Sequence, residues 1–135
     1  MGRALSVDQY YQSLLARVAE LPSVRSSELT LDVRGEFVAF IRGNIYFTDD
    51  SHLHLRELVD AESDVKKTRY VYHYQRANNS LVFRYNNTEH YPDLPNFPHH
   101  KHVGDEANVI STPEPDLAIV LKEIEGLVTT DTQTG

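Results

Sequence analysis

The sequence predicts one α+β domain, in which a five- to six-stranded antiparallel meander sheet lies between an N-terminal and a C-terminal helix. Apolar residues recur every three to four positions near both ends of the chain, whereas between residues 28 and 85 they alternate with polar residues. Short turn-forming clusters separate the alternating segments. Each helix has one apolar face, so we expect both helices to cover the same face of the sheet.

The length and composition predict a single folded unit. A chain of 135 residues with 40% hydrophobic residues can bury a core without disulfides, and it has no cysteine to form them. We expect residues 1–128 to form the domain and residues 129–135 to form a flexible C-terminal tail. The sequence leaves the oligomeric state open, and a homo-oligomer is compatible with it.

The predicted elements follow in chain order. Ser6 and Gln9 form a capping-box pattern before an apolar helical face, and Pro22 ends this helix. Six alternating segments then predict strands at residues 28–33, 37–41, 45–47, 52–59, 69–75 and 81–85, with a turn at Arg42-Gly43-Asn44 among those that separate them. Residues 86–100 contain three prolines and no periodicity, which predicts a long irregular loop. Ser111 or Thr112 with Pro113 opens the second helix, and Gly126 helps to end it.

Charge is distributed unevenly along the chain. The net charge of -7 argues against a nonspecific nucleic-acid binder. Residues 65–104, however, carry six basic and two acidic side chains, a net charge of +4, and hold five of the seven histidines. An anion site is therefore expected in this segment. No apolar run has the length of a signal peptide or of a membrane span, so we expect a cytoplasmic protein without a membrane partner.

The densest group of reactive side chains is Phe97-Pro98-His99-His100-Lys101-His102. If this segment is extended, His100 and His102 face the same way and could chelate one metal ion, with Glu57 or His73 as a further ligand. The spacing matches no strong zinc motif, and Lys101 would repel a cation. Alternatively, the cluster is a solvated loop without chemistry.

Two strands can contribute to the same site. If the turn between them is tight, His73 and Arg84 become cross-strand or diagonal neighbours. Glu57 lies among apolar neighbours on its strand, which is costly for a carboxylate unless it is paired or used. Each residue also has a purely structural interpretation: His73 as a half-buried strand residue, and Arg84 as the ion-pair partner of Glu57.

Phosphoryl transfer without a metal or other cofactor would give a role to the cationic residues as well as to the histidines, whereas metal binding would not. Cleavage of RNA by its own 2′-hydroxyl needs a general base, a general acid and a cation for the phosphate. His100 or His102 with His73 could be the acid and base, and Lys101 or Arg84 the phosphate ligand. The candidate catalytic residues are therefore five from the positive segment together with one strand carboxylate, namely His73, Arg84, His100, Lys101, His102 and Glu57.

These segments resemble the TumE family, which consists of toxins of type II toxin–antitoxin pairs. The resemblance spans most of residues 28–127, and its most specific part is the Phe97 to His102 run. It implies a toxin neutralised by a helix-turn-helix antitoxin, but it supplies no established catalytic residues. The family often has Asp where this chain has Asn86, and a second His where it has Tyr91, which leaves the activity of this copy open.

The leading hypothesis is thus a toxin with metal-independent ribonuclease activity, whose site lies on one sheet face and is closed by residues 86–102. A non-enzymatic protein-binding module and a His-ligated, metal-dependent hydrolase are the alternatives.

Overall fold

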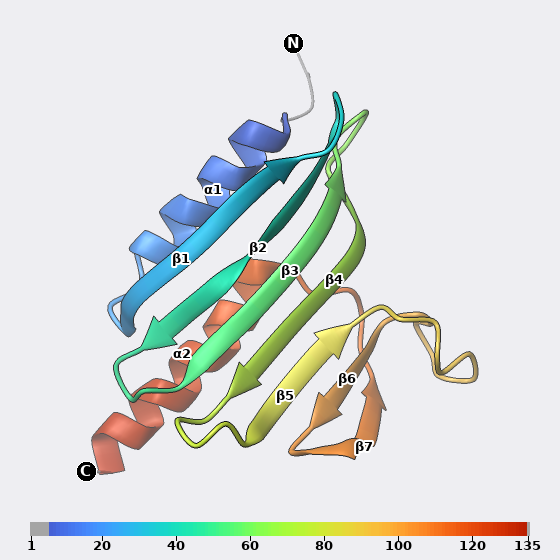
Figure 1. Cartoon of the computed structure of the whole chain (residues 1–135). Coiled ribbons are helices and arrows are strands. Elements are labelled where there is room, and N and C mark those ends of the chain that lie inside the picture. The colour runs from blue at the N-terminus through green and yellow to red at the C-terminus, as the bar shows by residue number, and fades with distance from the viewer. Residues whose placement is uncertain (1–5, 135) are drawn as a thin grey trace.

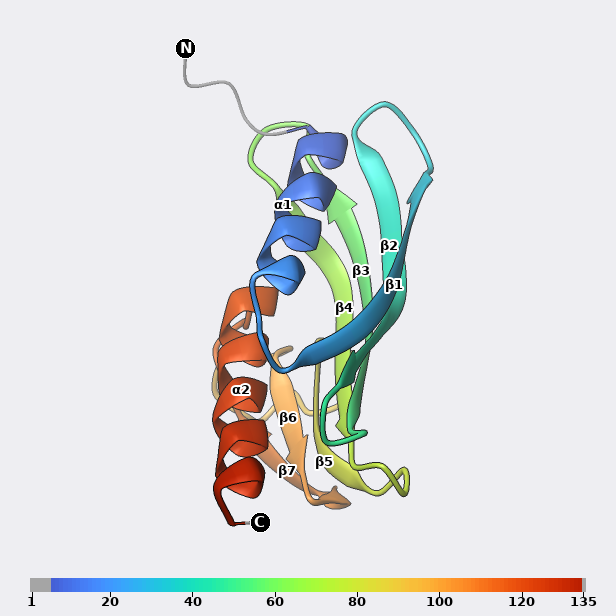
Figure 2. The same ribbon diagram turned by 90° about the vertical axis from the view of Figure 1, so that its left-hand side faces the viewer.

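A computed structural model describes residues 6–134, and it describes side chains as far as Val128. A seven-stranded antiparallel sheet carries two helices on one of its faces (Figures 1 and 2). The predicted α+β class and the placement of both helices are confirmed. The elements are α1 Val7–Ala19, β1 Val24–Val33, β2 Val38–Phe47, β3 His52–Asp60, β4 Lys66–Gln75, β5 Leu81–Asn86, β6 His100–Val103, β7 Asp105–Ser111 and α2 Leu117–Thr134.

Each strand pairs with the next one in the chain, so the sheet order is β1 to β7 without a crossover. This confirms the predicted meander, with one strand more than expected. Direct cross-strand partners share a face of the sheet. The register therefore decides which side chains meet the helices and which do not.

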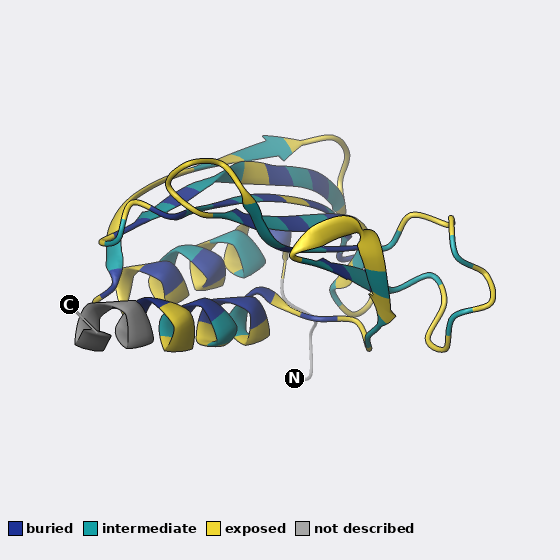
Figure 3. Cartoon of the chain, turned by 90° about the horizontal axis from the view of Figure 1, so that it is seen from below, coloured by how far each residue is buried: buried dark blue, intermediate teal, exposed yellow. Residues whose placement is uncertain are grey.

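The core lies between the sheet and the helices (Figure 3). Leu14 and Val18 of α1 and Val120 and Ile124 of α2 are buried there, which confirms the apolar faces predicted for both helices. The predicted capping box of α1 is also present, because the Ser6 side chain accepts from the backbone N–H of the third helical residue and the side chain of that residue accepts in return.

The predicted turn at residues 42–44 is wrong, because β2 runs through it and pairs with β1 and β3 along its length. Gly43 is explained by close packing instead. A Cβ atom built on Gly43 would lie 2.0 Å from the backbone oxygen of Glu28 and 2.8 Å from Cα of Leu29. Glycine at this position lets the edge strand β1 approach β2 closely.

The predicted irregular loop is shorter than expected and is followed by a hairpin. The irregular connection occupies residues 87–99 and projects beyond the end of β5 (Figure 1). His100 then begins β6, and Gly104, with φ +72°, turns the chain into β7. The histidine cluster thus lies on a strand, where alternation splits its side chains between the two faces of the sheet.

The second helix begins later than predicted. Asp116 caps α2 by accepting from the backbone N–H of Ile119, and the helix continues past Gly126 to Thr134. The flexibility expected of residues 129–135 stays a prediction, and residue 135 lies outside the described residues. Within residues 6–134, no helix combines the length and apolar character needed to cross a membrane.

Candidate functional site

The sheet face opposite the helices, here called the open face, carries a row of polar side chains. Asn44, His54, His73, Arg84 and His102 are successive cross-strand partners from β2 to β6. The predicted pairing of His73 with Arg84 is confirmed, and Arg84 is also directly opposite His102. Three residues that are distant in sequence therefore place the Arg84 guanidinium between one imidazole on β4 and one on β6.

Arg84 occupies the centre of this row and is held by a carboxylate from β7. Its Nη1 atom donates to Oε2 of Glu106 at 2.6 Å. The Arg84 side chain is 22% exposed and that of Glu106 is 63% exposed, so one edge of the pair is open to solvent. The neighbouring strands are each about 4.8 Å away, and a group bound over Arg84 would lie between His73 and His102.

His100 and His102 share the open face, as expected for an extended segment, with ring centroids 5.2 Å apart. The Nδ1 atom of His100 lies 3.0 Å from the Pro98 carbonyl oxygen, and that of His102 lies 2.8 Å from the Glu106 carbonyl oxygen. A carbonyl oxygen only accepts, so each Nδ1 carries the proton and each Nε2 carries a lone pair in the neutral ring. The buried Nε2 of His100 has no hydrogen-bond partner in the part of the chain whose side chains are described, residues 6–128.

Tyr91 from the 87–99 connection covers these two imidazoles. Its ring centroid lies 4.8 Å from that of His100 and 6.2 Å from that of His102, in edge-to-face geometry. His100 is only 1% exposed and His102 is 5% exposed, although both are on the open face. Tyr91 thus closes one end of the polar row.

The surroundings of His73 and His100 favour their neutral forms by lowering the pKa of each. Burial, followed by the nearby Arg84 guanidinium, lowers the pKa of His73. Burial also lowers the pKa of His100, against the opposing effect of its hydrogen bond to the Pro98 carbonyl. Arg84 lowers the pKa of the Glu106 carboxyl, mainly through their hydrogen bond. A neutral imidazole can accept a proton, as a general base must.

Lys101 does not join this site, because alternation directs it to the helix-covered face. Its Nζ atom donates to Oε2 of Glu123 on α2 at 2.7 Å and lies over the rings of Phe83 and Tyr85. His99 turns to the same side, where it contacts Tyr70. The expectation that Lys101 acts as a phosphate ligand beside His100 and His102 is therefore wrong.

Glu57 is also on the helix-covered face and is fully buried. Its two carboxylate oxygens accept from the hydroxyls of Tyr10 on α1 and Tyr72 on β4. Lys67 Nζ donates to the Tyr72 hydroxyl at 2.8 Å and to the carbonyl oxygen of Pro115. Glu57 is thus paired in a buried network that joins sheet and helices, and Arg84 pairs with Glu106 rather than with Glu57.

The sequence interpretation missed Glu106 and the contribution of His54. Glu106 reaches the site only because β6 and β7 form a hairpin, and the Gly104-Asp105 pair is the turn signal that could have indicated it. His54 lies directly opposite His73, and its Nδ1 atom is 3.1 Å from Oδ1 of Asn44. The period-two pattern of β3 placed His54 on one face but could not say which strand would lie beside it.

Two other findings limit the chemistry of the site. Asn86 uses its side-chain oxygen to accept from the backbone N–H and hydroxyl of Thr88, so it stabilises the start of the connection. Among residues 6–128, whose side chains are described, no group of three or more His, Asp or Glu side chains has the geometry of a metal site. His100 and His102 offer a pair of nitrogen ligands.

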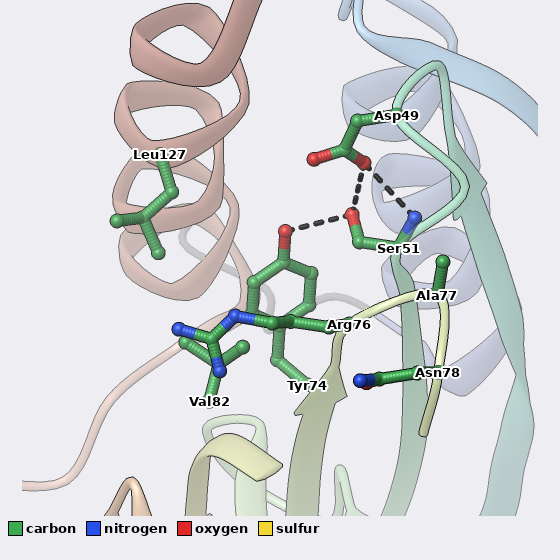
Figure 4. Close-up of a pocket in the computed structure, with 8 residues that line it drawn as sticks. All are labelled: Asp49, Ser51, Tyr74, Arg76, Ala77, Asn78, Val82 and Leu127. Carbon is green, nitrogen blue, oxygen red and sulfur yellow. Dashed lines mark hydrogen bonds between the residues drawn. The ribbon is translucent and has the colours of Figure 1, made fainter. Parts of the chain in front are cut away.

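A separate hollow of about 430 Å³ lies at the other end of the sheet, beside Leu127 of α2 (Figure 4). There the Tyr74 hydroxyl donates to Oγ of Ser51 at 2.7 Å, and the Ser51 backbone N–H donates to Asp49 at 2.9 Å. These bonds stabilise the turn between β2 and β3. None of the predicted site residues lines this hollow, so the polar row on the open face is the candidate functional site.

Comparison with known proteins identifies the family. The model of the family described as Toxin TumE matches residues 13–128, which include every element from most of α1 to most of α2. No curated protein and no solved structure gives a significant match. The matched region contains the whole polar row and its covering loop. The chain belongs to the TumE toxin family.

Proposed function

We propose that this toxin cleaves RNA at the row formed by His73, Arg84 and His102. The single observation that supports the proposal is the direct pairing of Arg84 with an imidazole on each side. A phosphate bound by Arg84 would lie within reach of a proton acceptor on one side and a proton donor on the other. This is the arrangement that internal cleavage of RNA requires.

In the proposed reaction, neutral His73 removes the proton of a ribose 2′-hydroxyl. The 2′-oxygen then bonds to the adjacent phosphorus, and the bond from phosphorus to the 5′-oxygen breaks. Protonated His102 gives its proton to that 5′-oxygen, so the products are a 2′,3′-cyclic phosphate and a 5′-hydroxyl. Arg84 stabilises the negative charge on the phosphoryl oxygens, and His100 acts as a positioning residue behind His102.

The toxin family implies an antitoxin partner. We propose that this antitoxin is a helix-turn-helix protein and that it blocks the open face. Binding there would keep RNA away from Arg84 without any change in the fold.

His102 and Lys101 are adjacent on β6 but lie on opposite faces of the sheet, so matched substitutions at these two positions test the proposal. His102→Gln removes a proton donor from the open face, and we expect it to lower the cleavage rate by about 10²- to 10⁴-fold and to abolish toxicity. Lys101→Gln alters the helix-covered face and is expected to leave both properties within a few-fold of the wild type. Growth after induction and the integrity of total RNA are measured for each variant.

Two outcomes would contradict the nuclease proposal. One is a toxic protein whose RNA stays intact, and the other is a His102→Gln variant that cleaves like the wild type. If His100, Lys101 and His102 can be replaced together without loss of toxicity, the protein acts instead as a non-enzymatic binding module.

A metal-dependent hydrolase is the second candidate function. It is favoured by the paired imidazoles of His100 and His102, each with Nδ1 fixed by a carbonyl oxygen and Nε2 left to coordinate. Elemental analysis of protein purified without a histidine tag tests it. A near-stoichiometric ion that is lost in the His100→Gln variant would support this candidate over the metal-independent reaction.

A further inference from the structure

Phe40 on β2 is surrounded by arginine side chains on the open face. The guanidinium carbons of Arg34, Arg42 and Arg56 lie 5.8, 5.9 and 5.7 Å from the centre of its ring. The Phe40 ring is half-buried, so part of it stays accessible. An aromatic ring among guanidinium groups offers both a stacking surface and positive charge.

These cations are poorly compensated by the protein itself. Arg42 and Arg56 are directly opposite each other on β2 and β3, a like-charge pairing that costs stability. Among the side chains that the structure describes, as far as Val128, no carboxylate lies within 4.0 Å of Arg42, Arg56 or Arg69, whereas Arg34 pairs with Asp32. The unpaired charges on a chain of net charge -7 indicate an anionic ligand.

A pocket of about 460 Å³ lies beside Phe40 on strands β2, β3 and β4. Its lining includes the apolar side chains of Phe40, Leu58 and Val71 and the cationic side chains of Arg56 and Arg69. The start of the 87–99 connection completes the wall with Asn87, Thr88, Glu89 and His90. The volume suits a single nucleotide, and a lining that combines apolar side chains with two arginines and one carboxylate, Glu89, keeps a net positive charge that suits a base with its phosphate.

The pocket adjoins the proposed site along the strands. Arg56 is two residues from His54 on β3, and Val71 is two residues from His73 on β4. Two residues of a strand span roughly 7 Å, so the pocket and the polar row are adjacent on one surface. A chain lying over Arg84 could therefore place its next nucleotide beside Phe40.

We infer that the Phe40 pocket is a nucleotide subsite for single-stranded RNA, in which one base stacks on Phe40 and Arg56 and Arg69 hold the adjoining phosphate. The inference rests on the proposed function for the choice of RNA. It extends that function by naming where the substrate binds and in which form. A duplex keeps its bases stacked and paired, so only a single strand can place a base against Phe40.

The test uses a fluorescein-labelled 2′-O-methyl oligoribonucleotide of ten mixed bases, because it lacks the 2′-hydroxyl that cleavage consumes. Fluorescence anisotropy measures its Kd for the wild type and for matched variants over a salt series. We expect Phe40→Leu to raise Kd by about 5- to 100-fold and Phe40→Tyr to bind like the wild type. Arg56→Gln should raise Kd and reduce the salt dependence of log Kd by about 0.7.

Arg76→Gln removes an exposed arginine at the β4–β5 turn and is the control for net charge. It should change Kd by less than about twofold, by the same counterion argument. Unchanged binding by Phe40→Leu, equal affinity for a duplex of the same sequence, or no binding by the wild type would each overturn the inference. A Phe40→Leu variant that no longer binds the antitoxin but still binds RNA would also overturn the inference, and it would show that the pocket binds the antitoxin.

Cleavage is measured separately on the unmodified oligonucleotide. If binding depends on Phe40 but no cleavage occurs, the proposed nuclease function fails and the subsite stands. If cleavage depends on His102 but binding does not depend on Phe40, the subsite fails and the nuclease function stands.

Discussion

At the scale of single residues, alternation along a strand decides what each polar side chain can do. His102 faces a guanidinium on the open face, while the adjacent Lys101 forms an ion pair with α2 on the other side. The chemical character of the two residues suits the same phosphate, but the sheet separates them. Glu57 is separated from Arg84 in the same way.

Glu57 provides a prediction at this scale. Glu57→Ala would leave the Tyr10 and Tyr72 hydroxyls buried without their acceptor, and it would remove the carboxylate that interacts most strongly with Lys67. We expect a loss of about 3 kcal/mol in the free energy of unfolding, measured by urea denaturation. Tyr10→Phe removes one of the two donors and keeps the ring, so it should cost about 1 kcal/mol. Full stability in Glu57→Ala would show that the network contributes nothing.

At the scale of elements, β2 is continuous because its glycine serves packing rather than turning. Gly43 and Asn44 are both turn-forming residues, yet neighbouring strands on both sides of β2 supply hydrogen-bonding partners along this segment. The long strand in turn places Phe40 and Arg42 beside the residues of β3. The cluster of arginines around Phe40 therefore forms only if β2 continues through Gly43 without a turn.

Replacement of Gly43 by alanine tests this explanation. The added Cβ would collide with the β1 backbone, and we expect a loss of about 1–3 kcal/mol in unfolding free energy from overpacking. Gly35→Ala is the matched control, because a Cβ at Gly35 has no atom within 4 Å. Thermal unfolding of both variants gives the comparison. Equal melting temperatures would mean that β1 can move away without cost.

At the scale of the whole molecule, burial of histidines makes stability depend on pH. Burial is the largest cause of the lowered pKa of His54, His73 and His100, each relative to an ordinary value of 6.5. In the unfolded chain these imidazoles bind protons as the pH falls through about 6.5, while the folded protein still resists protonation. The unfolded state then binds more protons, so acidification favours unfolding.

We therefore expect the urea midpoint to be constant above about pH 7.5 and to fall steadily between pH 6.5 and pH 5. His73→Gln should reduce this slope, because it removes one of the three groups. The comparison is made at constant ionic strength, so that the ion pair between Arg84 and Glu106 is screened equally throughout. A midpoint that stays constant or rises on acidification would contradict the assignment of neutral buried imidazoles.

The sequence was informative wherever local spacing carries the signal. The capping box at Ser6, the apolar faces of both helices and the neighbouring positions of His73 and Arg84 are consequences of helical and strand periodicity together with short turns. The same reasoning failed at Gly43, where a turn-forming residue is needed for close packing. It also failed after residue 99, where a strand of four residues is too short to show a periodic pattern.

By itself, the sequence determined that this protein is an α+β meander with a family-specific histidine segment and a positive central region. Only the tertiary structure decided that His100 and His102 belong with His73 and Arg84, while Lys101 and Glu57 belong to the helix-covered core. The physical reason is that strand register and the covering of one sheet face are set by contacts between distant segments. Those contacts, and not the composition of the histidine cluster, fix which side chains can share one ligand.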